Sequence, residues 1–147
     1  MRRVFSCLGE NVVYNTTVEK DFDRWHALKS WLHQQHNQPT FQEREVWWCS
    51  IGLNVGHEED GKNDYFNRPV LILRKFNKQL FWGVPLTTRI KESPHYYIID
   101  FRSKKQCVML THLRLYDSKR LTHKAGKIGS GQFRSVRNAL ADRLYIK

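Results

Sequence analysis

The sequence predicts a mainly β fold, a small antiparallel barrel or sandwich with one helix near each end. The main observation is a series of five short runs, rich in aromatic and β-branched residues, between residues 45 and 113. These runs are EVWWCSI, RPVLILR, LFWGVPL, HYYIID and CVMLTHL. The second observation is size, because 147 residues allow one domain with a buried core. The third is composition, since 40% hydrophobic residues are typical of a globular chain.

The first predicted element is a helix at about residues 19–35. Four apolar residues recur there at helical spacing: Phe22, Trp25, Leu28 and Leu32. Thr16 and Glu19 have the spacing of a capping box, and Pro39 closes the segment. This apolar face needs another part of the molecule to cover it.

The last predicted element is a helix within SGQFRSVRNALADRLYI. Its apolar residues share one face: Phe133, Val136, Leu140 and Leu144. Ser130 is the expected N-cap, because a serine hydroxyl can accept a hydrogen bond from a free amide of the first turn. The preceding DSKRL stretch is predicted to be a tight turn.

The formal net charge of +11 favours a polyanionic partner, with nucleic acid first and an anionic membrane surface second. A basic surface that only keeps the protein soluble is the simpler alternative. Cys7, Cys49 and Cys107 are far apart and form no zinc-binding pattern, so no metal site is expected. Such sparse cysteines fit a reducing compartment, and we expect a cytoplasmic protein.

Membrane association through a helix is not expected. The start, MRRVFSCLGENVV, is basic and then apolar, but the apolar part is short and Glu10 and Asn11 interrupt it, so a signal peptide is not predicted. No stretch approaches the roughly 20 apolar residues that a membrane helix needs.

Arg68 is unusual because it stands at the start of an apolar run, in FNRPVLIL. Val70 to Leu73 read as a buried strand, so a charged residue beside them must reach solvent, pair with an acid or bind an anion. Glu58 and Glu59 in the preceding polar stretch are the candidate acids for an ion pair.

Five segments occur in a characteristic order: EVWWCSIGLNVGHEEDGK, RPVLIL, VPLTTR, SPHYYIID and VMLTHLRLYDSKRL. This order resembles the MazF/PemK (Kid-like) toxins of type II toxin–antitoxin systems, over about residues 44–145. The resemblance implies a toxin domain at 44–147 and an extension at 1–43. Two features depart from the family: the extension itself, and a longer, more charged loop before the Arg-Pro pair. RNA sequence preference therefore does not carry over.

The resemblance implies an SH3-like or CcdB-like barrel that forms a homodimer. It also implies a metal-independent endoribonuclease that needs no cofactor, cleaves single-stranded RNA by attack of the 2′-OH, and is inhibited by a cognate antitoxin. We expect that antitoxin to be acidic. Two alternatives share the fold: a CcdB-like poison of DNA gyrase, and a catalytically silent module that binds RNA or the antitoxin. Arg68 and Thr87 in their motifs, with the +11 charge, favour the nuclease.

The family's catalytic arginine corresponds to Arg68 and its catalytic threonine or serine to Thr87, with Thr88 as the neighbouring alternative. The chemistry suits these residue types. A planar guanidinium binds phosphate oxygens through several donors, and a hydroxyl adds a further donor to the same group. The family's RNA-binding loop corresponds to about residues 54–67.

The residues expected to contact RNA are Asn54, His57, Glu58, Thr88, Arg89, His95 and His112. His57 is also a possible acid or base, because imidazole titrates near neutral pH, and contact with RNA alone is its alternative. His95 has either a structural role or an RNA contact. His112 could contact a base or satisfy a backbone group.

Several other roles stay open from the sequence. Trp47 and Trp48 point to opposite faces of a strand, so one is expected inside and the other at the surface or a dimer interface. Arg114 either pairs with Asp117 or contacts RNA or a second subunit. The N-terminal helix packs on the barrel, extends the dimer or occupies a groove that the antitoxin would otherwise cover.

Overall fold

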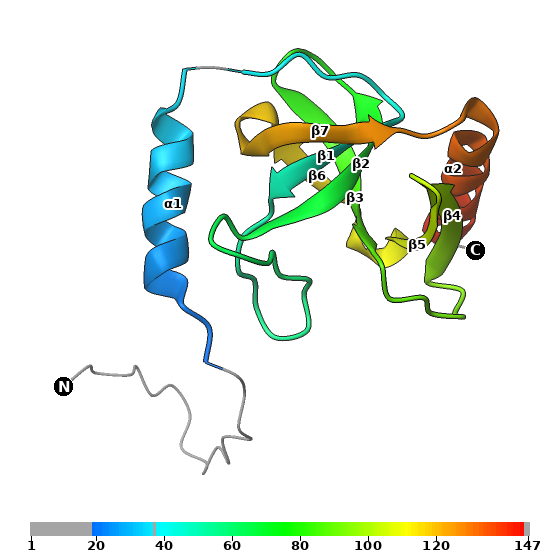
Figure 1. Cartoon of the computed structure of the whole chain (residues 1–147), viewed down its shortest axis with the longest axis horizontal. Coiled ribbons are helices and arrows are strands. Elements are labelled where there is room, and N and C mark those ends of the chain that lie inside the picture. Colours follow the sequence, from blue (N-terminus) through cyan, green and yellow to red (C-terminus); the bar gives the residue numbers. More distant parts are fainter. Residues whose placement is uncertain (1–18, 37, 146–147) are drawn as a thin grey trace, which may run out of the picture.

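The computed structural model describes residues 19–36 and 38–145, and it confirms the predicted mainly β class with a helix near each end. The strands are β1 (Glu45–Ser50), β2 (Asn67–Lys75), β3 (Leu80–Thr87), β4 (Tyr96–Phe101), β5 (Lys104–Met109), β6 (Arg114–Asp117) and β7 (Leu121–Lys127). The helices are α1 (Phe22–Gln34) and α2 (Ser130–Leu144), with short 3-10 turns η1 (Leu110–His112) and η2 (Ser118–Arg120). Figure 1 shows α1 and α2 at opposite ends of the sheet.

All strand pairs are antiparallel, in the order β4-β5-β3-β2-β1-β7, and β6 pairs with β3 outside this path. The strand β3 changes its neighbour along its length. Residues 80–83 pair with β6, whereas Leu86 and Thr87 pair with β5. The sheet therefore divides at β3 into two parts, and it is not closed into a complete barrel, since β4 and β7 end the path.

The central strands bury both of their faces, which explains the continuous apolar run in β2. On one face, Leu71 and Leu73 join the cluster that α2 covers. On the other, Val70 and Ile72 join a second cluster around Phe81. Strands buried on both faces show such runs instead of strict alternation.

The two tryptophans of β1 differ in burial, as expected from strand alternation. Trp47 is buried, and its indole Nε1 donates a 2.8 Å hydrogen bond to Glu45 Oε2. Trp48 is half-buried and stacks on the His123 ring, with 5.9 Å between centroids. The inside position therefore belongs to Trp47.

The predicted N-terminal helix exists but is shorter than residues 19–35. Asp21 caps it, because its side chain accepts a 3.0 Å hydrogen bond from the Arg24 amide, so Glu19 precedes the helix. Thr16, the other half of the predicted capping box, lies outside the described residues, as does Cys7. The predicted apolar face is correct for Trp25 and Leu32, which are buried, and wrong for Phe22, which is 49% exposed.

The C-terminal helix buries Phe133, Val136 and Leu140, whereas Leu144 is exposed because the helix ends there. The predicted cap is wrong. Gly129 occupies the N-cap position, Ser130 is the first helical residue, and no side chain caps this end.

Two strands, β6 and β7, were not among the five predicted runs. The fifth run also ends earlier than expected, since β5 stops at Met109 and residues 110–112 form η1. The tight turn expected in DSKRL corresponds to η2, where Asp117 caps the turn by accepting a 2.8 Å hydrogen bond from the Lys119 amide.

Candidate functional site

The loop between β1 and β2 is held closed by its own backbone. The Gly52 amide donates to the Phe66 carbonyl over 3.0 Å, and the Gly61 amide donates to the Gly52 carbonyl over 2.7 Å. Gly52 has a φ of +86°, a conformation that favours glycine. These contacts fix the point where the loop enters β2, and therefore the position of Arg68.

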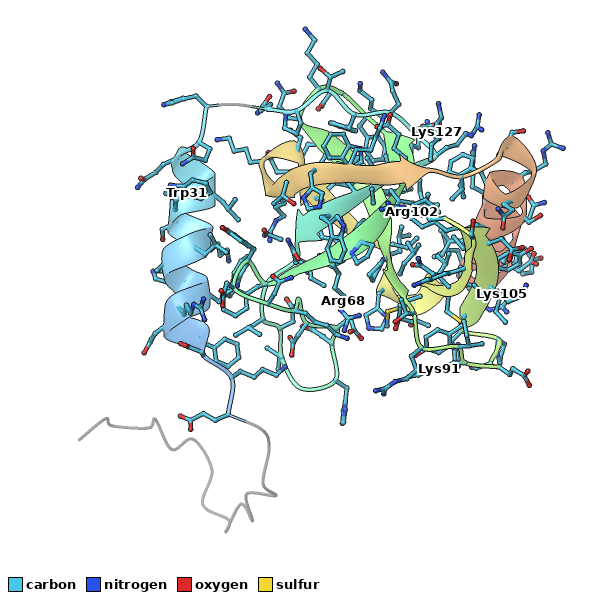
Figure 2. All side chains as sticks on the ribbon, viewed as in Figure 1. Trp31, Arg68, Lys91, Arg102, Lys105 and Lys127 are labelled. Atoms are coloured by element: carbon cyan, nitrogen blue, oxygen red, sulfur yellow. The ribbon has the colours of Figure 1, made fainter. Side chains whose placement is uncertain are left out.

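Arg68 pairs with an acid, one of the possibilities that its sequence position left open. Its Nη2 forms an ion pair with Glu59 Oε1, and its Nε donates a 2.6 Å hydrogen bond to the Asp60 carbonyl. The Arg68 side chain is only 12% exposed and that of Glu59 22%. Figure 2 shows Arg68 on the side of the sheet that carries the β1–β2 loop. The guanidinium is thus oriented by two neighbouring loop residues.

Thr87 is the last residue of β3 and pairs with Cys107 of β5. The β2–β3 pairing ends at Val70 and Pro85, two residues short of both Arg68 and Thr87. The Thr87 Oγ1 accepts a 3.2 Å hydrogen bond from the Arg89 amide. Arg68 and Thr87 therefore lie at the same end of the β2–β3 pair, beyond its last paired residues.

A cavity of about 400 Å³ opens beside this end of the sheet. Its lining comes from the β1–β2 loop, β3, η1 and β6: Ile51, Asn54, Glu58, Glu59, Pro85, Thr111, His112, Leu113, Arg114 and Tyr116. It holds two carboxylates, one imidazole and one guanidinium. These groups can bind a polar ligand and move protons.

Three of the residues expected to contact RNA line this cavity: Asn54, Glu58 and His112. Asn54 is fixed by the loop, since its amide donates to Asp60 Oδ1 over 2.6 Å. The His112 Nδ1 lies 3.1 Å from Thr111 Oγ1.

The other four expected RNA contacts are exposed and do not line the cavity: His57, Thr88, Arg89 and His95. His57 lies at the exposed tip of the β1–β2 loop. The remaining three flank the segment between β3 and β4. They could meet a long ligand that extends out of the cavity, but not a small one inside it.

Arg114 belongs to the cavity, and no Arg114–Asp117 ion pair occurs in the described part of the chain. Its guanidinium lies over the Tyr116 ring, 5.1 Å from the centroid. Tyr116 was not recognised from the sequence as part of the site, because a single aromatic residue in a strand most often signals only a core position.

Burial keeps Cys49 and Tyr116 protonated at neutral pH. Burial raises the pKa of the Cys49 thiol to about 12, although the nearby charges of Arg120 and Arg114 act in the opposite direction. Burial likewise raises the pKa of Tyr116. Burial lowers the pKa of Arg120, whose Nη1 donates a 2.9 Å hydrogen bond to the Ser50 carbonyl. Cys49 is therefore not a nucleophile at neutral pH.

No group of three His, Cys, Asp or Glu side chains among the described residues could hold a metal ion. Within the same residues, no helix is long and apolar enough to cross a membrane.

The fold is similar to that of solved MazF toxins. MazF from Deinococcus radiodurans superposes with a TM-score of 0.56 and 21% identity, covering 74% of this chain and 97% of that protein. The toxin MazF-mt6 from Mycobacterium tuberculosis superposes with a TM-score of 0.54 and 14% identity, covering 71% of this chain and 99% of that protein. An endoribonuclease from a mycobacterial species was solved with its cognate antitoxin. It superposes with a TM-score of 0.56 and 16% identity, covering 71% of this chain and 95% of that protein. No curated protein sequence matches the chain.

The architecture is thus that of these small toxins. Residues 42–144 match the PemK-like, MazF-like toxins of type II toxin–antitoxin systems, and the chain belongs to this family. The matched region begins after α1, which lies outside the part shared with the family.

Proposed function

We propose that the chain is an endoribonuclease that cleaves single-stranded RNA. The observation that carries this proposal is the position of Arg68, a shielded and oriented guanidinium at the start of β2. A guanidinium of this kind suits a phosphate, because its planar donors match the phosphate oxygens. The neighbouring cavity provides room for nucleotide groups.

In the proposed reaction, the ribose 2′-oxygen forms a bond with the adjacent phosphorus and the bond to the 5′-oxygen breaks. The 2′-OH gives up its proton, and the leaving 5′-oxygen takes one. Negative charge builds up on the two other phosphate oxygens as the fifth bond forms. Arg68 and Thr87 donate hydrogen bonds to these oxygens, and such preorganised donors act mainly on the transition state.

The proton transfers need a base and an acid near the phosphate. Glu58 and Glu59 supply carboxylates at the cavity and His112 supplies an imidazole. Arg68 itself is a poor base, because a guanidinium does not readily give up its proton. His57 would take part only if the RNA lies across the loop tip, where this side chain is exposed.

We also propose a homodimer in the cytoplasm and an acidic cognate antitoxin as the inhibitory partner. A chain with a net charge of +11 attracts an acidic segment as well as RNA. A similar endoribonuclease was solved with its cognate antitoxin, which supports a partner of this kind. We expect the antitoxin to lie across the cavity and block access to Arg68.

The test is incubation of the purified protein with a long single-stranded RNA in EDTA. The expected products carry a 2′,3′-cyclic phosphate and a 5′-OH, because the internal 2′-OH is the nucleophile. An RNA with a single 2′-O-methyl group at a mapped cleavage position should resist cutting there. Intact RNA after incubation with a folded sample would refute the proposal. A product with a 5′-phosphate would refute this mechanism.

A further inference from the structure

The segment that precedes the toxin domain is joined to the candidate site by one lysine. Lys20 Nζ lies 2.7 Å from Asp60 Oδ2, and it donates hydrogen bonds to the carbonyls of Asn54 over 2.7 Å and Gly56 over 3.3 Å. The Lys20 side chain is only 20% exposed. One ammonium group therefore ties together three points of the β1–β2 loop.

Apolar packing supports the same connection. Trp25 of α1 meets the Phe66 ring edge to face, with 5.7 Å between centroids, and both join a cluster with Leu32. A Cβ atom on Gly52 would lie 2.2 Å from the Trp25 ring, so the loop backbone approaches the indole as closely as a glycine allows. In Figure 1, α1 stands beside the loop, at the far end of the sheet from α2.

A short series of contacts leads from Lys20 to Arg68. Lys20 binds the Asp60 carboxylate, and the Asp60 carbonyl accepts the hydrogen bond from Arg68 Nε. Glu59, the residue next to Asp60, supplies the carboxylate on the Arg68 guanidinium. If Asp60 moves, both contacts that orient Arg68 move with it.

We propose that Lys20 is a positioning residue, through which the N-terminal extension sets the orientation of Arg68. This inference rests on the proposed nuclease function only for its effect on catalysis. Its geometric part is that Lys20 keeps the Asp60 carbonyl in its hydrogen bond with Arg68, and this part does not depend on any reaction. A displacement of about 1 Å at a reacting centre can cost about 10²-fold in rate, so the effect on catalysis should be measurable.

The test variant is Lys20→Met, which keeps the length of the side chain and removes its charge. Lys20→Arg is the conservative rescue. Asp60→Asn removes the charge of the partner and retains Oδ1, which accepts from the Asn54 amide. Lys29→Met is the matched control, because Lys29 is an exposed lysine of α1 that makes no hydrogen bond or ion pair with the described residues.

The first readout is proton exchange of the Arg68 Nε–H by NMR, with the signal assigned through Arg68→Lys. Its bond to Asp60 protects this proton, so Lys20→Met should speed exchange by about tenfold or more, as expected for a local opening. Asp60→Asn should do the same. The double variant should add little, because both changes remove one shared contact. Lys20→Arg should restore slow exchange, and Lys29→Met should leave it unchanged.

The second readout is cleavage of RNA by the same variants. Lys20→Met should lower kcat by about tenfold or more with a much smaller change in KM. Unchanged Nε–H exchange in Lys20→Met would overturn the proposal, whether or not the wild type cuts RNA. Faster exchange with an unchanged kcat would also overturn it. If the wild type leaves RNA intact, only the proposed nuclease function is refuted. The exchange data then still test the positioning role of Lys20.

Discussion

The carboxylate of Glu59 forms an ion pair with the guanidinium of Arg68, the group that would bind a phosphate in the proposed reaction. Both side chains are largely shielded from solvent, and the bond to the Asp60 carbonyl holds the pair at the end of β2. A phosphate that binds through Nη2 must therefore displace Glu59. The ion pair competes with the ligand as well as orienting the guanidinium.

Replacing Glu59 with Gln should increase affinity for RNA. The amide gives a weaker bond to Arg68 than the carboxylate, by about 1 kcal/mol, so Kd should fall by about fivefold. The measurement is fluorescence anisotropy with a 2′-O-methyl RNA, which lacks the nucleophile. Glu92→Gln, an equal change of charge at an exposed position of the β3–β4 loop, is the control. An equal gain in both variants would mean that net charge alone explains the result.

Replacing Arg68 with Ala should reduce RNA cleavage by about 10²–10³-fold or more, because a preorganised charged donor is lost. Lys at this position should restore only part of the rate, since an ammonium lacks the planar fork. Thr87→Ala should cost less, because a neutral hydroxyl forms a weaker bond than a cation. Cleavage assays and thermal melts of each variant provide the comparison.

The Arg68→Ala variant also leaves Glu59 without its partner, and this effect must be separated from catalysis. Any fall in melting temperature should be recovered in the double variant Arg68→Ala with Glu59→Gln, whereas cleavage should not. A double variant that cuts RNA at the wild-type rate would remove Arg68 from the proposed mechanism.

Gly52→Ala should destabilise the protein by about 1–3 kcal/mol. The φ of +86° disfavours alanine, and the new Cβ would collide with the Trp25 ring. Gly131→Ala is the control, because a Cβ there meets nothing within 4 Å inside α2, where alanine favours the helix by about 1 kcal/mol. Urea unfolding followed by tryptophan fluorescence measures both. Equal stability of the two variants would contradict the close packing of α1 on the loop.

Glu45 should make the stability depend on pH in the acid range. Burial alone raises the pKa of Glu45, but hydrogen bonds from Trp47, Gln42 and Lys124 outweigh it and hold the pKa below its ordinary value of 4.5. A lowered folded pKa adds stability above pH 4.5, and this stability is lost as the pH falls through the folded pKa. Glu45→Gln should lower the free energy of unfolding at pH 7 and reduce its fall between pH 5 and pH 3. An identical fall in wild type and variant would exclude this role.

RNA binding should weaken steeply with salt. A single strand that loses counterions at about five phosphates has a slope near −3.5 in log affinity against log salt, which is about 10²-fold between 50 and 200 mM. Titrations of the 2′-O-methyl RNA at several salt concentrations measure the slope. A flat response would show that the net charge of +11 does not contribute to RNA binding.

The strands with a strong apolar signal could be predicted from the sequence, and the polar ones could not. The β2 run was recognisable because both faces of this strand are buried. The strand β7, LTHKAGK, buries only Leu121 fully, so no period of two appears in its sequence. It is formed through pairing with β1, which is a long-range effect.

The candidate site shows the same limit. The resemblance to MazF/PemK toxins selected Arg68 and Thr87, which lie just beyond the last paired residues of β2 and β3. The sequence left two glutamates as equal partners for Arg68. The structure pairs Arg68 with Glu59, in a loop that also contacts Lys20, a residue outside the family region, and no local pattern contains that information.

The Arg68–Glu59 pair gives the site an internal counterion. When a phosphate takes the place of the carboxylate, one anion replaces another, and the number of mobile ions released to the solvent at this position stays the same. Arg68 should thus discriminate between ligands by geometry, while the lysines and arginines elsewhere on the surface, such as Lys91, Lys105 and Lys127, govern how fast a polyanion arrives. Capture and recognition of RNA would then respond to different variables, the first to ionic strength and the second to the shape of the β1–β2 loop.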